Sequence, residues 1–320
     1  MTYYRLFVTN LEDEFSIAIL SYPGCMLSAV QGLNEMLFLT NDLCEKNNLP
    51  QRFIVDINDL DDIKKSSCKS SKIYKILIIP PNIEGGFYLN PDQILIDWIK
   101  KQHANGCIMS SICAGAFILA ACGLLEQRKV TTHWKLKEEF LKTFPNSQLD
   151  IRKILINDGD VITAGGLMSW LDLGLELVAQ FINTTTMRQL GKLLVVDTGL
   201  REQRYYQSFL PKYDHGDSKI LSIQHYIQAN YKKTITISVL AEQCFISERT
   251  FLRHFVRATG LKPLQYLQRV RIQKSCELLE TTKDTVEIIA SEVGYEDTSA
   301  FRKVFLRTVG LTPMSFRRRF

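Results

Sequence analysis

Residues 240–279 read LAEQCFISERTFLRHFVRATGLKPLQYLQRVRIQKSCELL, and residues 286–318 read VEIIASEVGYEDTSAFRKVFLRTVGLTPMSFRR. The two stretches carry one pattern at a spacing of 50 residues. The first copy has Phe251, Phe255, Arg257, Gly260, Leu261 and Pro263, and the second has Phe301, Phe305, Arg307, Gly310, Leu311 and Pro313. Self-similarity at a fixed spacing indicates a duplicated structural unit, here a pair and not a longer array.

Each copy predicts a helix-turn-helix unit. In the first, at about residues 237–257, a short apolar helix leads to Ser247, which suits the N-cap of the next helix. Phe251 and Phe255 are four residues apart, so they share the buried face of that helix. The glycine that follows each second helix suits the left-handed residue after a helix end. The second unit, at about residues 285–307, repeats this order with Gly294 in the turn and Asp297 as the cap.

The opposite faces of the two second helices point outward and are candidate DNA-reading surfaces. Their members are Arg249, Leu252 and Arg253 in the first unit and Thr298, Ser299, Arg302 and Lys303 in the second. Residues 264–279 predict a connecting helix of roughly 24 Å, at 1.5 Å per residue. Such a spacer holds two reading helices about one turn of B-DNA apart on one face of the duplex. The alternative is a plain helical bundle with a basic surface.

Over roughly residues 218–320 these stretches resemble the arabinose-operon regulator (AraC) family of transcription factors. The resemblance implies an all-α domain whose two helix-turn-helix units enter successive major grooves of double-stranded promoter or operator DNA. RNA polymerase is then a further candidate partner.

Charge is unevenly distributed along the 320 residues, a length that suggests two domains. Residues 217–320 carry 17 Lys and Arg against 10 Asp and Glu, a net charge of +7. The remaining 22 basic and 24 acidic residues leave residues 1–216 at −2. This asymmetry is typical of a nucleic-acid-binding region attached to a nearly neutral domain.

Eight cysteines occur singly, without a CxxC pair, and no histidine has metal-ligand spacing with a cysteine. We therefore expect free thiols in a reducing cytoplasm, and neither a metal site nor a cofactor. Residues 107–125 are apolar enough to span a bilayer, but Ser110, Ser111 and Gly115 interrupt them. A buried strand followed by a buried helix has the same composition and is the preferred interpretation.

The first 200 residues predict an α/β domain with a parallel sheet and helices on both faces. Short apolar runs predict strands at residues 15–20, 52–57, 74–79, 106–112, 154–156 and 161–163. Helices are expected at residues 27–44, from Asn90-Pro91 to about His103, and from Met168 to about Phe181. Residues 59–71 read as a polar connection. Residues 183–186 and 205–216 read as arm and linker, which gives domains at 1–200 and 218–320 joined by a linker at 201–217.

The segment SSICAGAFILA places Cys113 where an apolar strand meets a helix rich in small residues. Small residues permit the sharp turn called a nucleophile elbow, and the amides and dipole of the next helix favour a thiolate there. His133, in VTTHW, is a candidate partner. The alternative for Cys113 is a buried, inert cysteine, since free cysteine is among the most buried residue types. For His133 it is a structural histidine with its hydrogen bonds satisfied.

Several motifs of the first 181 residues, in their order along the chain, resemble the PfpI/class I glutamine-amidotransferase-like superfamily. They are YPG, CAGAF, GLL with TTHW, DGDVITAGG and DLGLELV. The match runs from about Phe15 to Phe181, and the order with the AraC-type region resembles that of GlxA-type transcriptional regulators. The resemblance implies a flavodoxin-like fold of the nucleophile-elbow type. It also implies a ligand site beside the elbow, at the carboxyl ends of the strands.

Two departures from the superfamily pattern argue against catalysis. The residue after the elbow cysteine, commonly histidine there, is Ala114, and the place of the acidic partner falls on Ala29. Without a carboxylate to tune the thiol, turnover is hard to support. We therefore assign no catalytic residue and take Cys113, Ala114, His133 and Ala29 as pocket candidates.

Three functions compete. The leading one is a transcription regulator whose N-terminal domain forms a homodimer and senses a small-molecule effector. The second is a cysteine-dependent enzyme of amidase, hydratase or glyoxalase type attached to a DNA-binding domain. The third is a constitutive DNA-binding protein whose N-terminal domain serves only for dimerisation. No membrane partner is expected.

Overall fold

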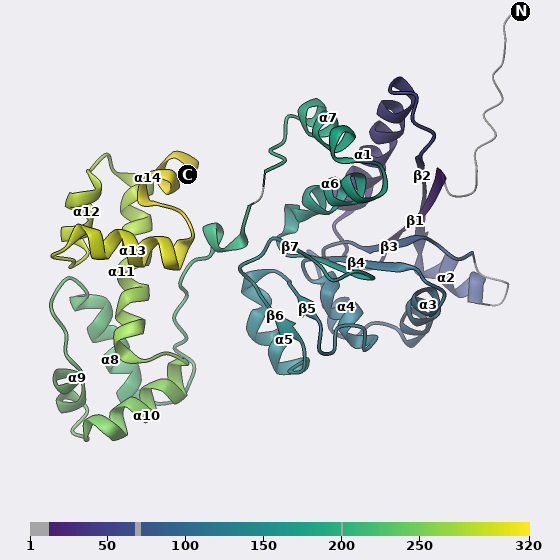
Figure 1. Ribbon diagram of the computed structural model, residues 1–320. Coiled ribbons are helices and arrows are strands. Elements are labelled where there is room, and N and C mark those ends of the chain that lie inside the picture. The colour runs from purple at the N-terminus through teal and green to yellow at the C-terminus, as the bar shows by residue number, and fades with distance from the viewer. Residues whose placement is uncertain (1–12, 68–71, 200) are drawn as a thin grey trace, which may run out of the picture. The chain divides into compact units, whose positions relative to one another are not determined.

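The structure, a computed structural model, describes residues 13–67, 72–199 and 201–320. The chain divides into two compact units, Met1–Gln203 and Arg204–Phe320, called here the N-terminal and C-terminal units (Figure 1). Each unit has hydrophobic cores of its own.

A six-stranded sheet of order β2-β1-β3-β4-β8-β7 forms the centre of the N-terminal unit. The strands are β1 (Glu14–Ser21), β2 (Arg52–Asp59), β3 (Ile76–Ile79), β4 (Ile108–Ile112), β7 (Leu155–Asn157) and β8 (Val161–Ala164). All neighbours are parallel except β7 and β8, which form a hairpin. β3 and β8 are buried along their whole length, as strands covered on both faces must be. The prediction of a flavodoxin-like parallel sheet is confirmed.

Helices cover both faces of this sheet (Figure 1). One face carries α1 (Leu27–Lys46), α6 (Trp170–Phe181) and α7 (Thr184–Leu194), and the other carries α3 (Gln93–Ala104) and α4 (Gly115–Ala121). The remaining short elements are α2 (Leu60–Ser67), α5 (Lys137–Thr143), β5 (Lys129–Val130) and β6 (Gln148–Leu149). Residues 107–125 form β4, the elbow and α4, as expected. Within the described ranges, no helix is both long and apolar enough to cross a membrane.

Two predicted connections are wrong because local capping and burial make them helical. Within residues 59–71, Asp59 accepts the amide N–H of Asp62 through Oδ1 at 2.8 Å, and Ile63 is buried, so α2 forms. The last four residues of that stretch lie outside the described residues. In the predicted arm at 183–186, the Oδ1 of Asn183 accepts the Thr186 amide at 2.7 Å and starts α7.

Two predicted helix starts are also displaced. α3 begins at Gln93 with Asp92 at the N-cap, so Pro91 precedes the helix. A 3₁₀ turn at Leu167–Ser169 comes before α6, which begins at Trp170 and not at Met168.

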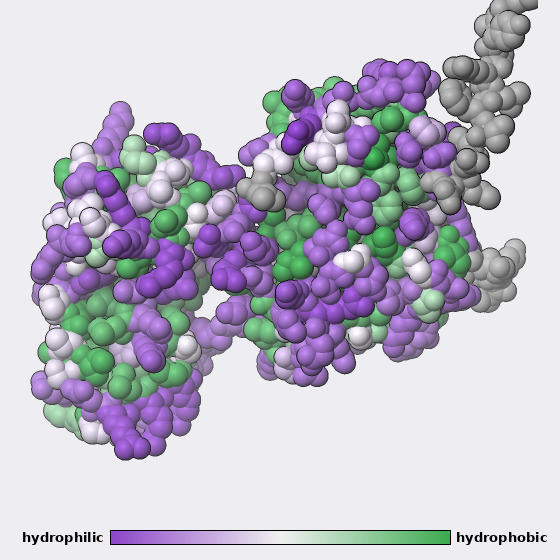
Figure 2. Space-filling model, in the orientation of Figure 1, coloured by the Kyte–Doolittle hydropathy of each residue, from purple (hydrophilic) through white to green (hydrophobic). Residues whose placement is uncertain are grey.

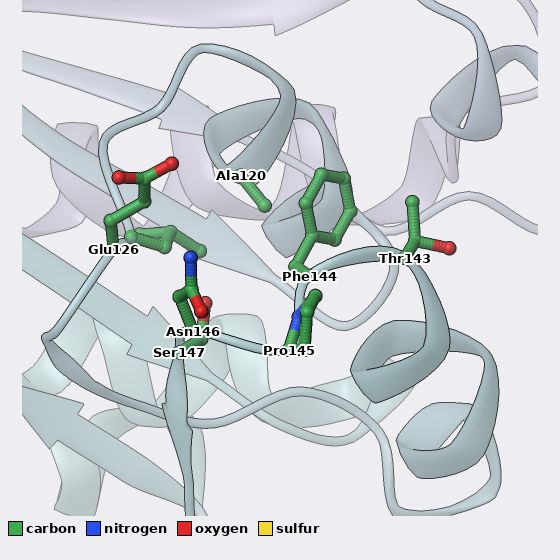
Figure 3. A pocket seen from close by; sticks show the side chains of 8 residues that line it. Ala120, Glu126, Thr143, Phe144, Pro145, Asn146 and Ser147 are labelled. Carbon is green, nitrogen blue, oxygen red and sulfur yellow. The ribbon is translucent and has the colours of Figure 1, made fainter.

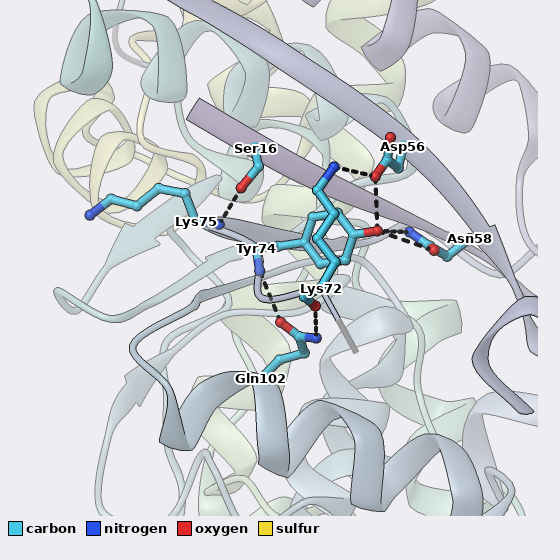
Figure 4. A network of polar contacts seen from close by, with 7 residues as sticks. All are labelled: Ser16, Asp56, Asn58, Lys72, Tyr74, Lys75 and Gln102. Carbon is cyan, nitrogen blue, oxygen red and sulfur yellow. Dashed lines mark hydrogen bonds and ion pairs between the residues drawn. The ribbon is translucent and has the colours of Figure 1, made fainter. Parts of the chain in front are cut away.

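A polar network fixes the entry into β3 (Figure 4). Gln102 of α3 is fully buried; its Nε2 donates to the Lys72 carbonyl at 2.8 Å and its Oε1 accepts the Tyr74 amide at 3.0 Å. The Tyr74 hydroxyl in turn donates to Asp56 of β2 at 2.9 Å. This network anchors the chain where it re-enters the sheet after residues 68–71.

The C-terminal unit is all helical, as predicted. Its helices are α8 (Ser218–Asn230), α9 (Ile237–Gln243), α10 (Glu248–Thr259), α11 (Pro263–Thr281), α12 (Val286–Glu292), α13 (Thr298–Val309) and α14 (Pro313–Arg319). α11 contributes to two separate cores: Tyr266 and Val270 pack in the first, and Ile272 and Leu279 in the second. Its 19 residues span about 28 Å at 1.5 Å per residue. It is the connecting helix that the sequence predicts between the two helix-turn-helix units.

Candidate nucleic-acid interface and sensor site

The first helix-turn-helix unit consists of α9 and α10. Ser247 caps α10, with its Oγ accepting the Thr250 amide at 3.4 Å. Phe251 and Phe255 are fully buried, and Gly260 ends the helix with φ 71°. The turn between the helices contains Phe245, which has φ 55° and a side chain that is 92% exposed.

Buried phenylalanines on one side of α10 leave its other side to solvent. Arg249 and Arg253 are exposed, whereas Leu252 is half-buried. The surface over α10 is mainly hydrophilic (Figure 2). The helix therefore presents two guanidinium groups to any partner on this face.

The second unit, α12 and α13, repeats this construction. Asp297 caps α13 by accepting the amides of Ser299 at 2.8 Å and Ala300 at 3.2 Å. Phe301 and Phe305 are fully buried, and Gly310 ends the helix with φ 90°. Ser299, Arg302 and Lys303 are exposed and Thr298 is half-buried.

The two faces differ in one contact that the sequence did not signal. The guanidinium of Arg302 binds Glu287 of α12 at 2.6 Å, and both side chains stay more than half exposed. This carboxylate lies 15 residues away on another helix, so only the three-dimensional arrangement reveals it. A partner of the Arg302 side chain must compete with Glu287.

The elbow forms where the sequence places it. Cys113 joins β4 to α4 with φ 55°, a conformation that non-glycine residues rarely adopt. A Cβ at Gly115 would lie 2.7 Å from the Ile79 carbonyl oxygen, so the small residue after the elbow is required by close packing. The backbone of Cys113 thus has nucleophile-elbow geometry.

Burial of the Cys113 side chain opposes ionisation of its thiol. Burial raises its pKa to about 12, although a hydrogen bond from the Ala114 backbone acts in the opposite direction. Ala29 is fully buried in the first turn of α1 and Ala114 is buried beside the thiol. The thiol is therefore protonated near neutral pH.

His133 is engaged elsewhere. Its Nδ1 accepts the Lys135 amide at 3.1 Å, which caps a short 3₁₀ helix at Trp134–Leu136, and its ring stacks on Trp134 at 5.6 Å. Burial and the Lys135 ammonium both lower the pKa of His133. The residue before His133, Thr132, contacts the elbow: its Oγ1 donates a hydrogen bond to the Cys113 carbonyl oxygen at 2.7 Å.

A buried glutamine that the sequence did not single out lies close to these residues. The side chain of Gln203 is 2% exposed, and its Nε2 donates to the carbonyls of Thr132 and Lys153. No motif surrounds it in the sequence, and it falls in the stretch that was expected to be linker.

A small pocket of about 110 Å³ lies at the C-terminal end of α4 (Figure 3). Ala120, Glu126, Phe144 and Asn146 are among its lining residues, and none of the four pocket candidates named from the sequence lines it. Within the described residues, no three His, Cys, Asp or Glu side chains group in a way that would hold a metal ion.

Comparison with known proteins matches each unit to a family model. Residues 55–180 match the DJ-1/PfpI family, and residues 240–319 match a helix-turn-helix domain. The chain is 26% identical over 222 residues to the HTH-type transcriptional regulator CdhR of Pseudomonas aeruginosa, a match that covers 68% of this chain and 65% of CdhR. It is 24% identical over 223 residues to the HTH-type transcriptional regulator GlxA of Rhizobium meliloti, covering 69% of this chain and 68% of GlxA.

Among solved structures, Drosophila melanogaster DJ-1beta aligns with a TM-score of 0.47 and 15% identity, over 57% of this chain and 99% of that protein. The two family models thus identify a DJ-1/PfpI region at residues 55–180 followed by a helix-turn-helix region at residues 240–319.

Proposed function

We propose that the protein is a sequence-specific DNA-binding transcription regulator. The observation that supports this most strongly is the pair of phenylalanine-anchored helices, α10 and α13, carried on one rigid helix about 28 Å long. A spacer of this length suits two reading helices in neighbouring major grooves of one duplex.

In this proposal, base edges are met by the candidate residues of the two faces. Arginine paired to guanine is the commonest specific contact in the major groove. Arg249 and Arg253 are exposed, whereas Arg302 must leave Glu287 before it can contact a guanine. The other candidate residues of the two faces are Leu252, Thr298, Ser299 and Lys303. The basic excess of the C-terminal unit supplies sequence-independent attraction to phosphate.

The N-terminal unit, in this proposal, dimerises and senses a small molecule in a bacterial cytoplasm. The similarity to bacterial HTH-type transcriptional regulators, which extends over two thirds of this chain, supports a regulatory role and a bacterial setting. Cys113 performs no turnover, because its neutral thiol lacks a carboxylate at Ala29 and His133 is held by Lys135. RNA polymerase is the partner through which bound protein would change transcription.

Selection of bound duplexes from random oligonucleotides at moderate salt tests the proposal. We expect enrichment of one site with two conserved clusters of base pairs. Retention of DNA without any enriched sequence would contradict it, because phosphate attraction alone gives that result.

One observation favours a second candidate, the cysteine-dependent enzyme. Cys113 keeps the positive φ of an elbow, and such strained residues concentrate at functional sites. Turnover of an amide, nitrile or α-ketoaldehyde that is lost in Cys113→Ser would establish this function. We expect neither the wild type nor Cys113→Ser to turn over these substrates, and we expect the two proteins to bind DNA with equal affinity.

A further inference from the structure

The side chain of Gln203 fills a polar site built by the ends of three neighbouring segments. Its Nε2 lies 3.1 Å from Thr131 Oγ1, 2.9 Å from the Thr132 carbonyl oxygen and 2.9 Å from the Lys153 carbonyl oxygen. Its Oε1 accepts the backbone N–H of Trp134 at 3.3 Å. Three oxygens thus face the amino group and one N–H faces the carbonyl of the same carboxamide.

The chemistry of the site fixes which way this group lies. Two of the three oxygens belong to backbone carbonyls, which can only accept hydrogen bonds. An NH₂ group must therefore point at them, and the oxygen must point at the Trp134 amide. A carboxylate in the same place would set an oxygen against two carbonyl oxygens, so the site discriminates a primary carboxamide from the corresponding acid.

The site is also shaped for this group. Gly165, which follows β8, faces Gln203 closely: an added Cβ would lie 1.9 Å from Nε2. The backbone of Gly165 does not have a positive φ, so a glycine is not needed here for a turn. It is needed because a side chain at this position would collide with Gln203. Any residue larger than glycine at position 165 would exclude the carboxamide.

The site lies where this fold places ligands. Thr132 accepts from Gln203 through its carbonyl and donates through Oγ1 to the carbonyl of Cys113 at 2.7 Å. Thr132 therefore links the Gln203 carboxamide to the elbow residue Cys113 through hydrogen bonds. The site lies at the carboxyl ends of β4 and β8. Parallel α/β sheets bind their ligands at that edge.

Gln203 is the first residue of a short 3₁₀ helix, Gln203–Tyr206, and the residues just before it are docked on the N-terminal unit. Arg201 forms two hydrogen bonds with Asp172, at 2.8 and 2.5 Å, and the Gln203 amide donates to the Arg152 carbonyl at 2.9 Å. The next residue, Arg204, is the first of the C-terminal unit and packs against Gly310, the C-cap of α13. A ligand that displaces the Gln203 side chain therefore changes the contacts of the residue that directly precedes the C-terminal unit.

We propose that this is the effector site, that it recognises a primary carboxamide, and that a small molecule carrying that group takes the place of the Gln203 side chain. The inference deepens the proposed sensing role and rests on it. Gln203 is the internal occupant of the site in the absence of effector. Its release removes the side-chain anchor of the residue that precedes Arg204, and leaves the segment held only by the Arg201–Asp172 and backbone contacts.

Chemical rescue of the full-length Gln203→Ala variant tests the site. The variant leaves the carboxamide position vacant, so acetamide should bind there and raise its thermal midpoint, whereas acetate at the same concentration should not. Wild type should show no such rise, because its own side chain competes at high effective concentration. If Gln203→Ala does not fold unaided, the same comparison is made on the yield of folded protein after refolding in acetamide or acetate.

Gly165→Ala is the matched control. It excludes both Gln203 and acetamide, so it should be destabilised like Gln203→Ala but gain nothing from acetamide. Equal effects of acetamide and acetate on Gln203→Ala, or an equal gain in Gly165→Ala, would overturn the proposal. Because these readouts involve no DNA, a failure here is distinguishable from a failure of the DNA-binding function, which selection of duplexes tests separately.

Discussion

Cys113 and Phe245 are non-glycine residues held in the left-handed region, with φ 55° in each case. This conformation costs roughly 1–2 kcal/mol for a residue with a Cβ. Cys113 is locked in place by the sheet on one side and α4 on the other, whereas the side chain of Phe245 extends into solvent. The same backbone conformation thus has opposite consequences at the two positions.

The Cys113 thiol should react slowly with iodoacetamide. With its pKa raised by burial from 9.0 to about 12, it carries roughly 10³-fold less thiolate near neutral pH than an ordinary thiol. The rate should rise with pH up to about pH 12 without a plateau at lower pH. Mass spectrometry of the modified peptide over a pH series measures this. Fast modification at pH 7, with a plateau, would show an activated nucleophile.

Replacing Phe245 by glycine should raise the free energy of unfolding of the C-terminal unit by about 1 kcal/mol. The change relieves the left-handed strain and removes a side chain that is 92% exposed, against a smaller entropic cost in the unfolded chain. Urea denaturation of the full chain measures it. Gly294→Ala is the matched variant in the second unit and should be destabilising, because its Cβ would lie 2.5 Å from the Lys232 carbonyl oxygen. A loss of stability in Phe245→Gly would reveal a partner for the phenyl ring.

Arg253→Ala should relax the preference for one base pair by about 1–3 kcal/mol, the value of a good bidentate contact with guanine. Competition binding with single-base variants of the selected site measures this preference. Lys283→Ala, an exposed change in the loop before α12, removes the same charge outside the two faces and should leave the preference intact. A loss of affinity that is equal for every sequence would assign Arg253 to phosphate.

At the scale of elements, α11 shows why the C-terminal unit could be predicted from its sequence. Each half of the unit is local: cap, buried phenylalanine pair and left-handed glycine follow one another within about 14 residues, so short-range patterns determine them. By contrast, α2 and α7 were missed because each depends on one capping side chain, Asp59 or Asn183, in a polar stretch without clear periodicity.

Because α11 contributes side chains to two separate cores, we expect the two halves of the C-terminal unit to lose stability independently. Phe251→Ala should cost about 3–5 kcal/mol and remove hydrogen-exchange protection mainly from α8 to α10. The equivalent Phe301→Ala should do so in α12 to α14. Exchange measured by mass spectrometry on each full-length variant gives the pattern. Loss of protection across the whole unit in both variants would indicate a single cooperative core.

At the scale of the molecule, the sequence was sufficient for the two domain types, the sheet and the location of the elbow. It was insufficient for the contacts that join distant segments, such as Glu287 with Arg302 and Gln203 with the strand ends. These contacts leave no spacing signal, since the partners lie 15 to 71 residues apart and only folding brings them together.

The net charge of +7 on residues 217–320 favours attraction to the phosphates of any DNA, so affinity alone does not test the central claim. The claim is that α10 and α13 read neighbouring major grooves of one duplex. Guanine contacts in the major groove are blocked by methylation at N7, which leaves phosphate contacts untouched.

Methylation interference on the selected site is therefore the most direct measurement. We predict two clusters of interfering guanines on one face of the duplex, about 10 base pairs apart, as the spacing set by α11 requires. Arg253→Ala should erase signal from one cluster only. A single cluster, or interference spread evenly along the duplex, would contradict the account.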